Sequence, residues 1–154
     1  MKEAIGGNFL FMIVIFFVIL FAGYICLSIN HTRAFNVKNS LIRIIERNGS
    51  GLESIEDLAS DDFFQEEVEA ELAEIGYRIN GDCGPEVGWV GFDEQGRVTG
   101  TNRAAFCVRR VNSSTGGIYK PMYYYEVKTF YHLELPIIRL LFDLSIKGDT
   151  KPMI

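Results

Sequence analysis

The chain has 154 residues, of which 48% are hydrophobic, and a formal net charge of −5 at pH 7. This length has room for one membrane-spanning segment and one modest folded domain, and it excludes a second large domain. The charge is small and opposite in sign to the basic stripes that neutralise phosphates, so we expect no nucleic-acid partner.

Residues 1–8 form a short, mildly charged leader that ends in Gly6, Gly7 and Asn8. The two glycines have two interpretations. They can give the chain a flexible approach to the next segment, because glycine accepts many backbone angles. Alternatively, they mark a site at which a leader is cleaved.

An uncharged apolar run occupies residues 9–29 and predicts a single transmembrane helix in contact with membrane lipid. At about 1.5 Å per residue it crosses a hydrocarbon layer of about 30 Å. The apolar core of a cleavable signal sequence is shorter, about 7–15 residues, and ends in small residues. This run ends in Ser28, Ile29 and Asn30, so we expect an uncleaved anchor. Cys26 is interpreted as a buried apolar thiol.

The helix is predicted to continue into water over residues 30–47. No proline or glycine lies between Asn30 and Asn48, and apolar residues recur at the three-, four- and seven-residue spacings of an amphipathic helix. These residues are Ala34, Phe35, Leu41, Ile42 and Ile45. A helix from Asn8 to Arg47 is about 60 Å long, and the apolar stripe on its outer half needs a partner in the domain that follows.

Residues 48–76 are predicted to be an acidic helical segment. Ser50 with Glu53 has the form of a capping box for a first short helix. A second helix is capped by Ser60 and ends at Gly76.

This segment carries ten acidic residues between Glu53 and Glu74 and no basic residue. A solvated helix face accounts for the charge, and an acidic docking surface for a basic partner is the alternative. We expect no metal site among its carboxylates, because a helix lacks the turn with which a calcium loop brings oxygens together. The carboxylates considered are Asp61, Asp62, Glu66 and Glu69.

Residues 77–154 are predicted to be an antiparallel sheet domain, because short extended runs alternate with turn residues. The shorter strands are Val87–Phe92 and Arg97–Thr99, which form a hairpin, Ala105–Val111, and an edge strand at Leu144–Lys147. Residues 112–117 read as a polar loop. Residues 137–142 are compatible with either a helix or a strand.

The longest predicted strand runs from Tyr119 or Met122 to Leu135 and ends before Pro136. Its alternate residues from Tyr123 onward face the core, which implies a sheet with one side covered by the preceding helices. The expected fold class is therefore α+β, with a long N-terminal transmembrane helix that continues into a soluble helix, and then a small antiparallel sheet domain packed on helices.

Cys83 and Cys107 are the only cysteines after the apolar run. An even count suits one disulfide in an oxidising compartment, and two unpaired thiols are the alternative. A zinc site with His132 lacks the usual ligand spacing and a fourth ligand.

Motifs of catalysis are absent from the sequence, which has no phosphate-binding glycine motif, no H-E-x-x-H, no G-x-S-x-G and no C-x-x-C. His31 and His132 are isolated and read as an interfacial and a surface histidine. We expect neither an enzyme nor a cofactor site.

These features together resemble type IV pilin-like proteins, and within that group the TadE-like minor pseudopilins of bacterial pilus and secretion systems. The resembling features are the leader Met1–Gly7 ending in glycine, the immediate apolar helix from Phe9, its continuation through Ala34–Asn39, and a small α+β domain with two cysteines that can pair. The group usually carries a glutamate at the fifth mature position, where this chain has Phe11 or Met12, depending on the cut.

The resemblance implies that a membrane peptidase cleaves after Gly6 or Gly7 and that the helix is stored in the bacterial cell membrane. It also implies assembly by helix packing with other pilin-like subunits and assembly-platform proteins, with the C-terminal domain extracytoplasmic. Small residues favour close packing between helices, and the candidates are Gly6, Gly7, Ala22 and Gly23.

The first functional hypothesis is accordingly a membrane-anchored structural subunit of a pilus-like or secretion assembly. The second is a single-pass membrane sensor or adaptor with a small extracytoplasmic binding domain. A membrane-tethered enzyme is the third, and the lack of catalytic constellations counts against it.

Overall fold

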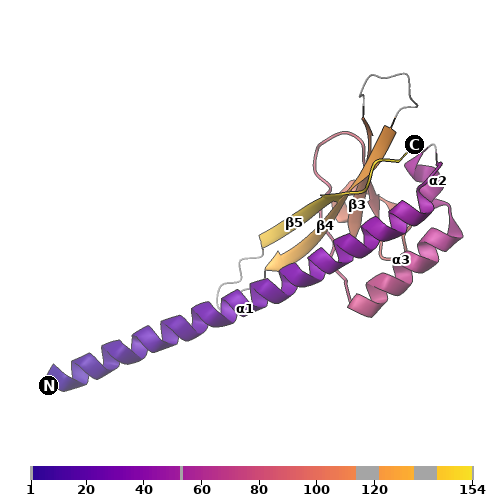
Figure 1. Ribbon diagram of the computed structural model, residues 1–154. Helices are drawn as coiled ribbons and strands as arrows, with labels where there is room; N and C mark the ends of the chain where they lie inside the picture. The colour runs from indigo at the N-terminus through magenta and orange to yellow at the C-terminus, as the bar shows by residue number, and fades with distance from the viewer. Residues whose placement is uncertain (1, 53, 114–121, 134–141, 154) are drawn as a thin grey trace.

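The protein begins with one long helix, α1 (Lys2–Asn48), whose two halves have different surroundings. In the computed structural model, which describes residues 2–52, 54–113, 122–133 and 142–153, its 47 residues form one uninterrupted helix. Such a helix is about 70 Å long. Figure 1 shows its amino-terminal half projecting alone and its carboxyl-terminal half lying against the other elements. The predicted continuation of the apolar helix into the domain is confirmed.

The carboxyl-terminal half of α1 is part of the core of the domain. Residues spaced three or four apart along it are buried, namely Ala34, Val37, Leu41, Ile44 and Ile45. The helix ends before Gly49, where only glycine fits. A Cβ at Gly49 would lie 2.6 Å from the Ile45 carbonyl oxygen and 3.1 Å from the Tyr125 ring.

Two helices follow, α2 (Ile55–Ala59) and α3 (Asp62–Ile75). The Ser54 hydroxyl accepts the Asp57 amide hydrogen, and the Asp57 carboxylate accepts the Ser54 amide hydrogen, both at 3.1 Å. This is a capping box, and it begins at Ser54. The prediction that Ser50 caps this helix is therefore wrong, because the turn after α1 is longer than expected.

The start of α3 also differs from the prediction, whereas its end agrees. Asp61 caps α3 by accepting the Phe63 amide hydrogen at 3.1 Å, while Ser60 closes α2. Gly76 ends α3 in the left-handed conformation, with φ of +69°, which glycine adopts without strain. The buried side of α3 consists of Phe64, Val68 and Leu72.

Five antiparallel strands form one sheet in the order β2-β1-β3-β4-β5. The strands are β1 (Trp89–Phe92), β2 (Val98–Thr99), β3 (Phe106–Ser113), β4 (Met122–Leu133) and β5 (Phe142–Asp149), with a short 3-10 helix, η1 (Thr101–Arg103), between β2 and β3. Each predicted strand has its counterpart. β3 includes Asn112 and Ser113, so the predicted polar loop starts later. The remainder of that loop and residues 134–141 lie outside the described residues.

One face of the sheet forms the main core with the helices. α1 and α3 lie side by side on this face (Figure 1). Phe92 stacks on Phe106 with ring centroids 5.1 Å apart, and Phe64 of α3 meets Phe92 edge-on at 5.9 Å. The alternation predicted for β4 is confirmed, because the residues expected on this face are buried at Tyr123, Tyr125, Val127 and Thr129.

The other face of the sheet is also partly covered, contrary to the expectation of one covered side. A second, smaller cluster of buried residues lies there, made of Cys83, Trp89, Ala104, Cys107 and Phe130. The chain between α3 and β1 supplies the cover. It pairs with the sheet through Gly81 and Ala104, whose amide and carbonyl groups exchange hydrogen bonds of 2.8 and 3.0 Å.

Candidate functional site

The amino-terminal half of α1 exposes apolar side chains on every side. Residues 7–22 are all exposed, and the exposed fractions of Phe9, Phe21 and Tyr24 are 68%, 64% and 68%. Within the described ranges this is the one helix long and apolar enough to cross a membrane, by length and composition. Exposing apolar surface to water costs about 25 cal/mol per Å². This half of the helix therefore needs lipid or other helices around it.

The domain begins where the apolar run ends. The Asn30 side chain donates a hydrogen bond of 3.2 Å to the His132 carbonyl oxygen, and the Thr129 hydroxyl donates one of 3.2 Å to the Ala34 carbonyl oxygen. Since Asn30 precedes Ala34 while His132 follows Thr129, β4 runs antiparallel to α1. The carboxyl end of β4 thus lies next to the apolar half of the helix.

The residues predicted for leader cleavage and helix packing all lie on α1. Gly6, Gly7 and Asn8 lie within α1, which is helical from Lys2 onward. A Cβ at Gly7 would meet nothing within 4 Å. Ala22 is exposed and Gly23 is half-buried. The cleavage of the leader and the packing of these residues against other helices stay predictions.

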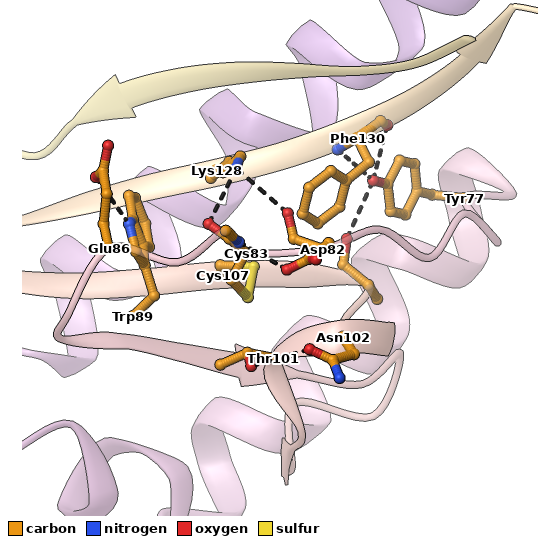
Figure 2. Close-up of a disulfide and its surroundings, with 12 residues drawn as sticks. Tyr77, Asp82, Cys83, Glu86, Trp89, Thr101, Asn102, Cys107, Lys128 and Phe130 are labelled. Atoms are coloured by element: carbon orange, nitrogen blue, oxygen red, sulfur yellow. Dashed lines mark hydrogen bonds between the residues drawn. A yellow bond between two sulfur atoms is a disulfide. The ribbon is translucent and has the colours of Figure 1, made fainter.

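A disulfide joins Cys83 to Cys107 across the second face of the sheet, with the two Cα atoms 5.8 Å apart. Figure 2 shows the bridge between the chain that precedes β1 and the start of β3, with Trp89 and Phe130 nearby. Both cysteines are buried. Because their sulfur atoms are bonded to each other, neither cysteine is available as a zinc ligand. Of the two alternatives left open by the sequence, a disulfide and two unpaired thiols, the structure has the disulfide.

The Lys128 ammonium reinforces this closure from β4. It donates hydrogen bonds to the carbonyl oxygens of Cys83 and Asp82, at 3.0 and 3.3 Å. Desolvation, together with the charge of Lys147, lowers the pKa of Lys128. The bridge and the lysine therefore hold the same stretch of chain from two neighbouring strands.

Tyr77 connects α3 to the sheet, and sequence reasoning did not single it out. Its hydroxyl accepts the Phe130 amide hydrogen at 2.9 Å and donates toward the carbonyl oxygens of Phe130 and Ala105, at 2.9 and 3.1 Å (Figure 2). Burial raises the pKa of this phenol well above its usual 10.0. The signal in the sequence is its position: Tyr77 directly follows Gly76, which ends α3, so it is the first residue after the helix that can contact the sheet.

A charged cluster surrounds the single tryptophan on the second face. The Glu86 carboxylate accepts hydrogen bonds from the Trp89 indole at 3.2 Å and from Arg109 at 3.0 Å. Arg109 also binds Glu126 at 2.5 Å, and its guanidinium carbon lies 4.8 Å from the centre of the Trp89 ring. The indole hydrogen bond, aided by the charge of Lys147, lowers the pKa of Glu86. These contacts link the side chains of the cluster to one another around the indole.

The histidines and carboxylates form no ligand set in the part of the chain that the structure describes. His31 meets Tyr131 edge-on with ring centroids 5.7 Å apart, and His132 is half-buried on β4. Among the described residues, no group of three or more His, Cys, Asp or Glu side chains is placed to hold a metal ion.

Some of the acidic residues of α3 bind α1. The Glu67 carboxylate accepts hydrogen bonds from Arg47 at 2.5 Å and from Asn48 at 3.0 Å. The Glu71 carboxylate accepts one from the Ser40 hydroxyl at 2.7 Å. This side of the predicted solvated face is thus a contact within the domain, while the acids on the opposite side remain exposed.

A cleft of about 210 Å³ lies between the end of α3 and the turn that joins β1 to β2. Its lining combines acidic, basic and apolar side chains from Glu69, Leu72, Ala73, Gly76, Tyr77, Arg78, Glu94 and Gln95. The sequence offered no motif for it, because the cleft forms only when α3 packs on the hairpin.

The fold and these surfaces define a class of protein: an α+β domain, closed by a disulfide, that is built on the continuation of one long apolar helix. Comparison with protein-family models, with curated protein sequences and with solved structures found no match.

Proposed function

We propose that this protein is a membrane-anchored structural subunit, a pilin-like protein of the minor pseudopilin type in a bacterial pilus or secretion assembly. The observation that carries the proposal is the division of α1. Its first half is exposed on every side, whereas its second half is built into the core of the domain. A simple anchor requires only the first property. In a helix with both properties, the way that neighbouring helices pack against its first half in the bilayer determines the position of the domain outside.

The physical work of such a subunit is association. In the bilayer the apolar half of α1 exchanges lipid for neighbouring helices, and small residues such as Ala22 and Gly23 let backbones approach closely. Beyond the bilayer the same helix holds the sheet in a fixed orientation through the hydrogen bonds at Asn30 and Ala34. Packing of the helix therefore sets how neighbouring domains meet.

The disulfide supports an extracytoplasmic position for the domain, because such bonds persist in oxidising compartments. The basic residues Arg33, Lys38, Arg43 and Arg47 follow the apolar run, and a count of charges alone would place them in the cytoplasm. We give the disulfide more weight, since buried and bonded cysteines bear on the folded domain directly.

Protease accessibility on intact cells tests this topology. With an epitope at the carboxyl terminus, we expect external trypsin to remove the epitope by cutting at exposed basic residues such as Arg97 and Arg103. A cytoplasmic marker must stay intact in the same cells. Protection of the epitope on intact cells, with digestion only after permeabilisation, would contradict the proposed topology.

The cleft at the end of α3 favours a second candidate, a single-pass sensor or adaptor. Glu69 and Arg78 give it both charge signs, which suits a small polar ligand or a peptide end. A sensor depends on this cleft, whereas a structural subunit depends on its helix. Replacing Arg78 with alanine should then abolish function in a sensor, and should leave the assembly of a structural subunit unchanged.

A further inference from the structure

α1 and α3 present opposite charges on the side that faces away from the sheet. We define the acidic face as Asp62, Phe63, Glu66, Ala70 and Glu74 of α3, and the basic face as Arg33, Asn36 and Arg43 of α1. We propose that two copies of this chain associate as a parallel dimer in which each acidic face contacts the basic face of the other copy. The inference rests on the membrane anchorage proposed above, because the membrane holds both copies at the same depth.

No described residue of the same chain covers the acidic face. Glu66 and Glu74 are exposed and make no hydrogen bond or ion pair with any described residue, unlike Glu67 and Glu71 on the α1 side. Phe63 stands among these acids with 68% of its surface exposed. An exposed aromatic ring between unpaired carboxylates is typical of a contact surface.

The basic face is likewise left uncovered by the part of the chain that the structure describes. Arg43 is exposed, while its neighbours Leu41 and Ile44 are buried in the core, so its side chain points away from the sheet. Arg33 is exposed nearer to the apolar run. Neither arginine makes an ion pair with a described residue. Arg47 differs, since Glu67 of its own chain already binds it.

The two faces lie at matching heights. Ser40 contacts Glu71 and Asn48 contacts Glu67, so α3 runs antiparallel to α1 at the level of residues 40–48. Arg43 therefore lies at about the level of Ala70, which has Glu66 one turn to one side and Glu74 one turn to the other. The small alanine leaves room for an arginine to approach both carboxylates.

Symmetry then selects the arrangement. A two-fold axis along the membrane normal keeps every residue at its height and places α1 of one copy opposite α3 of the other, twice. Contacts of α1 with α1, or of α3 with α3, would instead bring like charges together. Exposed ion pairs are individually weak. Confinement of both apolar helices in one membrane raises their effective concentration and makes weak contacts sufficient.

Crosslinking of the full chain in its membranes tests this dimer. Two differently tagged copies carry Cys26→Ser, and one adds Asn36→Cys while the other adds Ala73→Cys, two exposed positions at similar height on the opposed helices. We expect a bismaleimide to join the two tags. The control pair is Val87→Cys with Val98→Cys, exposed positions outside both faces, and it should give no mixed product.

Charge reversal then tests the ion pairs. Arg43→Glu should abolish the crosslink, and adding Glu66→Arg and Glu74→Arg to that same chain should restore it. Arg103→Glu reverses an exposed arginine outside both faces and should have no effect. Retention of the Cys83–Cys107 bridge, measured by mass under non-reducing conditions, shows that each variant is folded.

Equal crosslinking by the control pair, indifference to Arg43→Glu, or no restoration by the triple reversal would overturn the dimer. Extraction of the same membranes with alkaline carbonate separates this failure from failure of the anchorage. A chain that stays in the membrane pellet without crosslinking contradicts the dimer alone, whereas a chain released into the supernatant contradicts the anchorage and the dimer together.

Discussion

Removal of the disulfide should destabilise the domain more than any single change on its surface. The change is the double substitution Cys83→Ala and Cys107→Ala. The two cysteines are 24 positions apart, and closing a loop of that length removes about 3.5 kcal/mol of conformational entropy from the unfolded chain, on the loop-closure account. We therefore expect the free energy of unfolding to fall by about 3 to 4 kcal/mol.

The single tryptophan makes this change measurable. Trp89 is 6% exposed and belongs to the same buried cluster as the bridge, so its fluorescence reports on that cluster. The assay is urea unfolding of the full chain in detergent micelles. Cys26→Ser lies on α1 outside the cluster and is the matched control, with an expected change within about 0.5 kcal/mol. A loss below about 1 kcal/mol for the double variant would refute the reasoning.

Three further predictions concern the helix and the second face. Val18→Asp should reduce the fraction of protein that resists alkaline carbonate extraction, because a charge at the centre of the bilayer costs about 3 kcal/mol, while Val18→Leu should not. Gly81→Ala should destabilise the domain by about 1 to 3 kcal/mol in urea, since the added Cβ would overlap the Phe130 ring. Tyr77→Phe should cost a similar amount, because the Phe130 amide hydrogen loses its acceptor. The pKa of Tyr77 in the folded protein is raised above 10.0, so this tyrosine stabilises the fold fully below that pH and less as the pH rises above it. The free energy of unfolding of Tyr77→Phe should therefore fall less steeply with pH in alkali than that of the parent protein.

Each of these predictions has a result that would count against it. Normal membrane retention of Val18→Asp would contradict the proposed span. Unchanged urea midpoints for Gly81→Ala or Tyr77→Phe would mean that the segment preceding β1 does not lie on the sheet as described. An alkaline transition of Tyr77→Phe that matches the parent protein would assign the pH dependence to other groups.

The long elements could be predicted from the sequence because their signals are continuous. The absence of helix breakers between Asn30 and Asn48 indicated one helix, and alternation along Tyr123–Thr129 indicated a strand with its buried face. A helix cap depends on a single residue, and this segment has several serines and aspartates close together that are each able to cap a helix. Ser54 caps α2 in place of Ser50, because the turn after α1 uses more residues than its glycines suggested, and Asp61 caps α3 in place of Ser60.

The second face of the sheet could not be predicted, because its cover comes from chain without regular structure. Phe130 lies between polar residues of β4, so the alternation assigned it to solvent. It is buried by the segment that the disulfide holds in place, and the sequence left the pairing of Cys83 with Cys107 open. The cleft beside Arg78 and the opposed charges of α1 and α3 likewise depend on which helix faces meet the sheet.

The mass of the mature chain tests the pilin-like proposal most directly. The full-length protein is produced in a bacterial host with a pilus or secretion peptidase, isolated from membranes and measured intact under non-reducing conditions. The proposal predicts a chain that begins at Gly7 or Asn8 and carries one disulfide. A chain that begins at Met1 would contradict processing by such a peptidase and would leave a plain membrane anchor.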